Sequence, residues 1–221
     1  MNWDKALKEQ ILGQRDWLEK EFEFLNKDLS ESLGLEGIQA GSSGQYGGKN
    51  GKGVCMEDLK IYIAIVTLIK PKNIVETGTY TGFSSCALGK VLDELNIGTK
   101  ITTIEYHHPF YYAAKSNADK LGLTNIDFRV GNTDLVLKDI IKEVNPEVVF
   151  LDGDSLSLEY FITKSMCDTI IGHDMFYMKT ELYAPRGADF VRSSKYDGFK
   201  LSGFITGECG VGLLYKENSD G

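Results

Sequence analysis

The chain has 221 residues, of which 42% are hydrophobic and 25% are charged, and its formal net charge is −8 at pH 7. This length and composition are typical of a soluble globular protein with one sizeable core. The negative charge would repel a polyanion such as DNA, and no run of lysine and arginine offsets it, so a general nucleic-acid binder is excluded. No stretch approaches the roughly 20 apolar residues that span a bilayer.

The amino terminus and the cysteines indicate a cellular compartment. The first residues lack a basic region followed by an apolar stretch, so no signal peptide is expected. The four cysteines, Cys55, Cys86, Cys167 and Cys209, are scattered and form no C-x-x-C pair. We therefore expect a cytoplasmic protein with reduced single thiols and no membrane partner.

Residues 1–54 are predicted to form an N-terminal helix followed by a linker or lid. Apolar side chains in residues 2–33 recur at spacings of three, four and seven, which predicts one amphipathic helix. That helix either packs on the domain surface or serves as a lid or homo-oligomer contact. Residues 34–53 contain eight glycines among polar residues. They predict a mobile loop that is either a plain linker or a lid over a site.

Residues 55–221 are predicted to form the main domain. Residues 55–70 are apolar almost throughout and favour a buried helix that Pro71 ends. Short runs rich in β-branched residues then alternate with helical patterns. The predicted strands are Asn73–Thr77, Lys100–Glu105, Ile126–Val130, Glu147–Asp152 and Asp168–His173. The predicted helices are Phe83–Leu95, Pro109–Leu121, Asp134–Val144 and Leu156–Lys164. This rhythm predicts a doubly wound, Rossmann-like α/β sheet with helices on both faces.

The last part of the chain departs from that rhythm. Phe199–Phe204 and Val211–Tyr215 read as two strands with no helix between them, so they must pair antiparallel. The prediction is therefore a sheet of seven strands whose last strand is antiparallel. This order is similar to that of class I methyltransferases.

The first predicted strand of the sheet runs into a glycine-rich turn. Glu76, Gly78 and Gly82 follow the pattern E-x-G-x-x-x-G, whereas a dinucleotide site needs G-x-G-x-x-G to seat a pyrophosphate. A carboxylate beside the turn would repel that pyrophosphate. S-adenosylmethionine has no phosphate and carries a sulfonium and an ammonium, which suit Glu76 directly or through a water. The turn therefore favours S-adenosylmethionine over NAD.

Glu105 ends the second predicted strand, where an acidic side chain can accept hydrogen bonds from both hydroxyls of a ribose. NAD and S-adenosylmethionine both carry that ribose, so Glu105 does not choose between them. Tyr106 follows and is placed to pack on an adenine.

The turn from Gly78 to Ser84 resembles the glycine loop of catechol O-methyltransferase-like enzymes, which read G-x-Y-x-G-Y-S. The resemblance extends from about residue 55 to residue 215. It implies that Gly78, Tyr80 and Ser84 line the methionine portion of the cofactor and that the segment Gly131–Thr133 borders the adenine. Residues and resemblance together give a predicted cofactor-binding set of Glu76, Gly78, Thr79, Tyr80, Gly82, Ser84, Glu105, Tyr106, Asn132 and Asp152.

Acidic residues also end the fourth and fifth predicted strands. Asp152 and Asp174 would meet at the cleft, and two carboxylates with open water positions suit Mg²⁺, which lowers the pKa of a hydroxyl and orients it. The resemblance to metal-dependent O-methyltransferases implies that Asp152, His173 and Asp174 are the metal ligands and the catalytic residues. Two departures stand out. Ser155 occupies the position of the catechol-type lysine base, and His173 replaces an acidic ligand, so His173 is alternatively the base. Asp152 alternatively contacts only the cofactor amine or the substrate.

The sequence thus predicts an S-adenosylmethionine-dependent O-methyltransferase that acts, with Mg²⁺, on a hydroxyl of a small molecule. One alternative is an NAD-binding dehydrogenase-type domain, which the missing third glycine and Glu76 disfavour. The other is a non-catalytic domain of the same fold that binds a partner through residues 2–33.

Overall fold

The computed structural model of the chain describes residues 3–36, 56–153, 156–173, 198–204 and 210–216. The predicted loop 34–53 falls almost wholly outside these ranges, as does the predicted metal ligand Asp174. Their roles therefore stay predictions.

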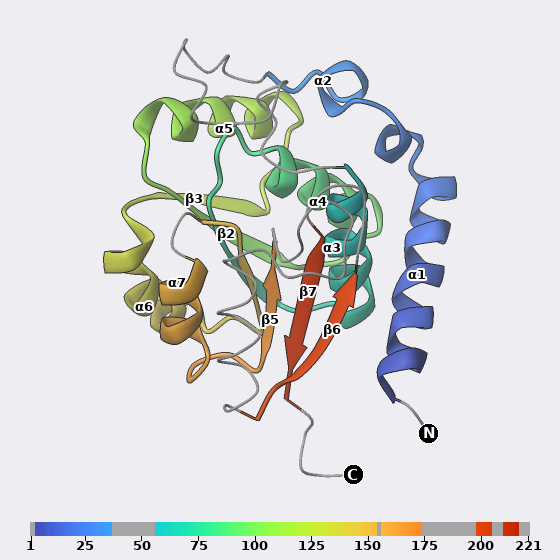
Figure 1. The fold of residues 1–221 in the computed structure, drawn as a ribbon. Helices are drawn as coiled ribbons and strands as arrows, with labels where there is room; N and C mark the ends of the chain where they lie inside the picture. Colours follow the sequence, from blue (N-terminus) through green and yellow to red (C-terminus); the bar gives the residue numbers. More distant parts are fainter. Residues whose placement is uncertain (1–2, 37–55, 154–155, 174–197, 205–209, 217–221) are drawn as a thin grey trace.

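A seven-stranded sheet forms the centre of the molecule, in the order β3-β2-β1-β4-β5-β7-β6 (Figure 1). The strands are β1 (Asn73–Thr77), β2 (Lys100–Glu105), β3 (Ile126–Val130), β4 (Val148–Leu151), β5 (Thr169–Gly172), β6 (Lys200–Phe204) and β7 (Val211–Tyr215). Strands β1 to β5 pair in parallel, and β7 lies antiparallel between β5 and β6. The predicted fold class is confirmed. The strand order reverses between β1 and β4, and ligands of open α/β sheets bind beyond the carboxyl ends at such a point.

Helices cover both faces of the sheet. They are α1 (Trp3–Glu21), η1 (Glu23–Asn26), α2 (Leu29–Ser32), α3 (Met56–Ile69), α4 (Phe83–Glu94), α5 (His108–Lys120), α6 (Thr133–Val144) and α7 (Leu156–Thr163). Alternate residues of each strand point to opposite faces. Ile74 and Phe150 therefore join the core under α3, α4 and α5, which we call the α3 face. Val75 and Val149 join the core under α6 and α7, which we call the α6 face.

Helix α3 is buried nearly all round because it lies between the sheet and α1 (Figure 1). Helix α1 buries Ile11 and Leu18, two members of its predicted apolar stripe. The ammonium of Lys60 on α3 pairs with Glu19 of α1 at 2.9 Å. The stripe therefore packs on the domain, as one of the two sequence interpretations held.

The prediction of one continuous helix over residues 2–33 is wrong. Helix α1 ends at Glu21, because Phe22 leaves helical geometry (φ −114°, ψ 89°) and the chain turns through η1. Asp28 then starts α2, and its side chain accepts the backbone N–H of Ser30 at 2.9 Å. Phe22 and Leu25 are still buried. The apolar spacing predicted which residues face the core, but not the break that lets the chain bend around it.

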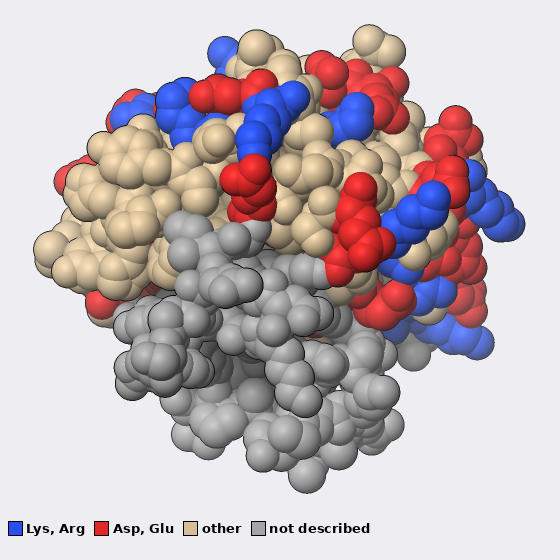
Figure 2. All heavy atoms as spheres, turned by 90° about the horizontal axis from the view of Figure 1, so that it is seen from above, with Lys and Arg blue, Asp and Glu red and all other residues tan. Residues whose placement is uncertain are grey.

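No helix among the described residues is long and apolar enough to cross a membrane. Figure 2 shows the molecule from above, where lysine and arginine side chains are interspersed with aspartate and glutamate along the top and right of the described surface. No field of a single sign is visible there.

Candidate functional site

A row of polar residues lies at the carboxyl edge of the sheet on its α3 face. The strand register places Glu76 of β1 beside Phe150 of β4, and Phe150 beside Ile171 of β5. Side chains alternate between the two faces along a strand, so the residues two positions after Glu76, its paired neighbour on β2, Phe150 and Ile171 lie on the same face, at the ends of their strands. On β2, β1, β4 and β5 these residues are Glu105, Gly78, Asp152 and His173. The fold thus brings together predicted site residues from four separate stretches of the sequence.

The glycine-rich turn fits tightly over this row. Gly78 has a φ of +77°, and a Cβ there would lie 2.5 Å from the backbone oxygen of Asp152, so only glycine fits. Tyr80 also has a positive φ, of 49°, which is uncommon for a residue with a side chain. Its backbone N–H donates to Glu105 Oε2 at 2.7 Å and holds the turn against the end of β2. The turn is a strained, fixed element beside the point where the strand order reverses.

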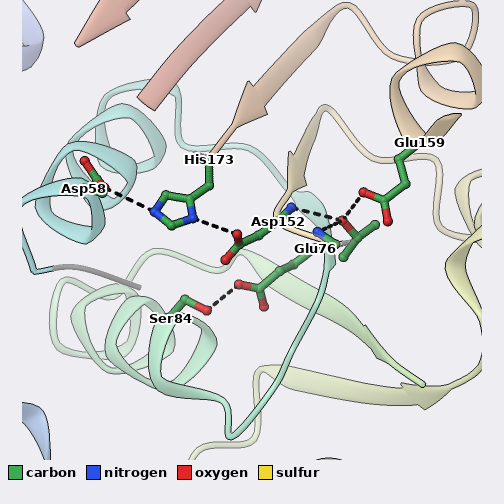
Figure 3. A network of polar contacts seen from close by, with 8 residues as sticks. Asp58, Glu76, Ser84, Asp152, Glu159 and His173 are labelled. Carbon is green, nitrogen blue, oxygen red and sulfur yellow. Dashed lines mark hydrogen bonds and ion pairs between the residues drawn. The ribbon is translucent and has the colours of Figure 1, made fainter. Parts of the chain in front are cut away.

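Glu76 lies beneath the turn and is fully buried. The hydroxyl of Ser84 donates to Oε1 at 2.7 Å (Figure 3). The hydroxyl of Ser85 donates to Oε2 at 2.6 Å. Burial raises the pKa of Glu76, the serine hydroxyls oppose that rise, and Asp152 adds to it. Glu76 and Ser84, both predicted to contact the cofactor, contact each other here. Glu76 therefore fixes the start of α4 under the turn.

Glu105 ends β2 beside the turn and is 6% exposed. Besides the N–H of Tyr80, it accepts the backbone N–H of His107 on Oε1 at 2.7 Å. Burial raises the pKa of Glu105, and the backbone donors oppose that rise. The neighbouring Tyr106 side chain is 61% exposed. Two backbone donors thus orient the carboxylate while the next side chain stays open to a ligand.

Asn132, another predicted cofactor residue, lies at the start of α6. Its side chain accepts the backbone N–H of Asp134 at 3.0 Å and caps the helix. This local role accounts for an asparagine at that position. Whether Asn132 also borders an adenine stays a prediction.

Asp152 and His173 are in direct contact, and a third residue joins them. His173 Nδ1 lies 2.7 Å from Asp152 Oδ1, and Nε2 lies 3.2 Å from Oδ2 of Asp58 on α3 (Figure 3). His173 is 3% exposed and Asp58 is 1% exposed. A neutral imidazole offers one donor and one acceptor, so one of these contacts requires a proton beyond the neutral ring, on the imidazole or on a carboxyl. The three residues therefore form a buried chain of polar contacts that runs from Asp58 through His173 to Asp152.

Sequence reasoning missed Asp58. The signal was an acidic residue in the first turn of a largely apolar helix, where a buried carboxylate requires a partner. Nothing in the sequence pairs that residue with His173, which lies 115 positions further along.

The magnesium prediction fits only part of this arrangement. Mg²⁺ prefers oxygen ligands, and His173 directs both ring nitrogens at carboxylates, so its geometry fits a proton-handling residue better than a metal ligand. The described residues contain no group of three or more histidine, cysteine, aspartate or glutamate side chains placed to hold a metal. A carboxylate pair of Asp152 with Asp174 stays a prediction, because Asp174 lies outside the described residues.

A second buried glutamate that the sequence analysis missed lies on the α6 face. Glu159 of α7 accepts the hydroxyls of Thr77 and Thr133, each at 2.8 Å. The Thr77 oxygen also accepts the backbone N–H groups of Asp152, at 3.1 Å, and Gly153, at 3.2 Å. Burial raises the pKa of Glu159, and the two threonine hydroxyls oppose that rise. This network holds the ends of β1 and β4 at a fixed spacing.

Comparison with known families decides the family. Residues 49–176, more than half of the chain, match the family model described as O-methyltransferase. The chain belongs to the O-methyltransferase family. A catechol O-methyltransferase of Niastella koreensis is similar to this family member, with 28% identity over 147 residues, or 63% of this chain. The match spans 65% of that relative, slightly less than two thirds of its length.

Solved structures confirm the fold of this O-methyltransferase-family chain. An O-methyltransferase from Streptomyces achromogenes, involved in tomaymycin synthesis and in complex with SAM, matches with a TM-score of 0.58 and 19% identity, over 75% of this chain and 82% of that one. An O-methyltransferase from Bacillus cereus in complex with SAH matches with a TM-score of 0.59 and 16% identity, over 91% of this chain and 96% of that one.

Proposed function

We propose that this chain transfers the methyl group of S-adenosylmethionine to a hydroxyl of a small molecule. The observation that carries the proposal is the cluster of carboxylates, Glu76, Glu105 and Asp152, around a turn in which Gly78 has room for no side chain. Such a site suits a cationic nucleoside that lies close to the backbone, and it would repel a pyrophosphate. Family membership and the SAM and SAH held by the two structural neighbours support it.

Glu105 is the residue we assign to the ribose. Its oxygens accept backbone N–H groups of Tyr80 and His107, and each carboxylate oxygen keeps a further lone pair for a ribose hydroxyl. Exposed apolar side chains lie near the ends of β2 and β3, with Tyr106 61% and Leu135 77% exposed. We assign the adenine to this end of the sheet.

Asp152 and His173 are the residues we assign to the acceptor side. Bound S-adenosylmethionine would supply an electrophilic methyl carbon on a sulfonium. The acceptor oxygen then bonds to that carbon as the carbon–sulfur bond breaks, and its proton must leave. Asp152, with a side chain 16% exposed, lies at the open end of the chain that runs through His173 to Asp58. We assign the proton to this chain.

Magnesium assistance is a separate part of the proposal and depends on Asp152 with Asp174. A metal bound there would lower the pKa of the acceptor hydroxyl. Assays with and without EDTA test this part. Loss of turnover on chelation and recovery with Mg²⁺ would support it, whereas unchanged turnover would leave the His173 chain as the base without a metal.

Calorimetry tests the cofactor assignment directly. We expect S-adenosylhomocysteine to bind and NAD not to bind. Glu105→Ala should abolish measurable binding, and Glu105→Gln, which keeps one acceptor oxygen, should weaken it about tenfold or more. Glu9→Ala is the matched control, because Glu9 is exposed on α1. Preferential binding of NAD would overturn the proposal in favour of a dehydrogenase-type domain, and SAH binding without turnover on any hydroxyl acceptor would favour a non-catalytic domain.

A further inference from the structure

Tyr62 is a large polar side chain that the site described above does not use. It lies on α3, one helical turn after Asp58, and is 1% exposed. Its ring stacks on Phe150 of β4, with centroids 3.9 Å apart and planes inclined by 12°. Phe150 lies between Glu76 and Ile171 in the strand register and two residues before Asp152. Tyr62 therefore packs directly below the polar row, on the α3 face.

The hydroxyl of Tyr62 is buried, and among the described residues it has no hydrogen-bond partner. Leaving a buried hydroxyl unsatisfied costs about 1–3 kcal/mol, so a phenylalanine would fill this position at lower cost if packing were its whole role. Burial raises the pKa of Tyr62 well above its usual value, and the charges of Glu76 and Asp152 raise it further. The hydroxyl thus stays protonated beside two acidic side chains.

We infer that the Tyr62 hydroxyl, together with Asp152, binds the ammonium group of the aminoacyl arm of S-adenosylmethionine. The inference rests on the proposed function. Of the two cationic groups of that ligand, only the ammonium has N–H groups, and these can donate to the phenol oxygen and to a carboxylate at once. The ribose is assigned to Glu105 at the end of β2, whereas Tyr62 stacks on Phe150 of β4, two residues before Asp152. Tyr62 therefore belongs to the aminoacyl end of the site.

The test compares three ligands on the full-length protein by calorimetry. S-adenosylhomocysteine carries the ammonium and the carboxylate, its decarboxylated analogue carries the amine alone, and 5′-methylthioadenosine carries neither. Tyr62→Phe should weaken binding of the first two about tenfold and leave 5′-methylthioadenosine unchanged. Tyr112→Phe is the control, since Tyr112 is 64% exposed on α5 and should change none of the three affinities.

The stability of the ligand-free variant separates a binding role from a structural one. Tyr62→Phe removes an unsatisfied hydroxyl and keeps the ring on Phe150, so its melting temperature should equal or exceed that of the wild type. A lower melting temperature would show a structural partner and overturn the inference. Equal loss for all three ligands, or no loss for any, would also overturn it while leaving the proposed function intact. A wild-type protein that binds none of the ligands would overturn both.

Discussion

Two buried glutamates on opposite faces of the sheet show how one chemical arrangement can serve two purposes. Glu76 on the α3 face and Glu159 on the α6 face each accept two hydroxyl donors, and burial raises the pKa of both. The donors to Glu159 tie α6 and α7 to the strand ends. Burial and, after it, the charge of Glu76 raise the pKa of Tyr62, whose buried hydroxyl has no hydrogen-bond partner among the described residues. A raised pKa therefore marks both glutamates alike, and their donors distinguish them: those to Glu76 both lie on α4, whereas those to Glu159 lie on β1 and α6.

The largest expected effect comes from breaking the turn above Glu76. Gly78→Ala would place a Cβ 2.5 Å from the backbone oxygen of Asp152 at a φ of +77°, so overpacking and backbone strain add. We expect a loss of about 3 kcal/mol or more in the free energy of unfolding. Urea unfolding measures it. Gly98→Ala is the control, because a Cβ there meets no atom within 4 Å and should change stability little.

Thr77→Val tests the network around Glu159 on the α6 face. The change removes the hydroxyl that donates to Glu159 and accepts two backbone N–H groups at the end of β4. We expect destabilisation of about 1–3 kcal/mol in chemical unfolding. Thr133→Val removes one hydroxyl bond to the same glutamate and should cost less. Equal losses for the two variants would show that Thr77 does not hold the strand ends.

A smaller effect is expected from Ser85→Ala on the Glu76 side. The change leaves Glu76 Oε2 without its 2.6 Å donor while Ser84 still serves Oε1. A loss of about 1 kcal/mol is expected by thermal unfolding. Ser85 was not among the predicted cofactor residues, so affinity for S-adenosylhomocysteine should change less than in Tyr62→Phe. If Ser85→Ala lowered the free energy of S-adenosylhomocysteine binding more than the free energy of unfolding, Ser85 would belong to the binding site.

The smallest expected effect is a stabilisation, and it comes from Glu76→Gln as pH rises. The pKa of Glu76 in the folded protein lies above its ordinary value of 4.5. As pH rises above 4.5, the unfolded chain therefore releases this proton before the folded protein does, and the free energy of unfolding of the wild type falls. Glu76→Gln does not titrate, so its stability relative to the wild type should rise with pH above 4.5 and the difference should vanish in acid. Melting temperatures between pH 4 and pH 8 measure this. A gap that widens toward acid would contradict the sign.

The fold and the glycine turn could be predicted because local patterns encode them; the cofactor contacts of that turn stay predictions. The strand Asn73–Thr77 and the turn Gly78–Gly82 are contiguous in the sequence. A run of β-branched residues indicates a strand, and closely spaced glycines indicate a turn. The contacts of Asp58 with His173 and of Thr77 with Glu159 could not be predicted from the sequence, because they depend on how α3 and α7 are rotated against the sheet. The break at Phe22 was missed for a related reason, because apolar spacing continues through it.

The packing of α3 depends on helix α1, which lies outside the segment that matches the family. The family match begins at residue 49, yet the side of α3 that faces away from the sheet is covered by Ile11 and Leu18, and Glu19 of α1 pairs with Lys60. The opposite side of α3 carries Asp58 and Tyr62. A truncated chain that starts at residue 49 would expose that apolar covering surface to water and loosen the helix that orients both residues. The folded unit of this protein is therefore longer than the segment that matches its family.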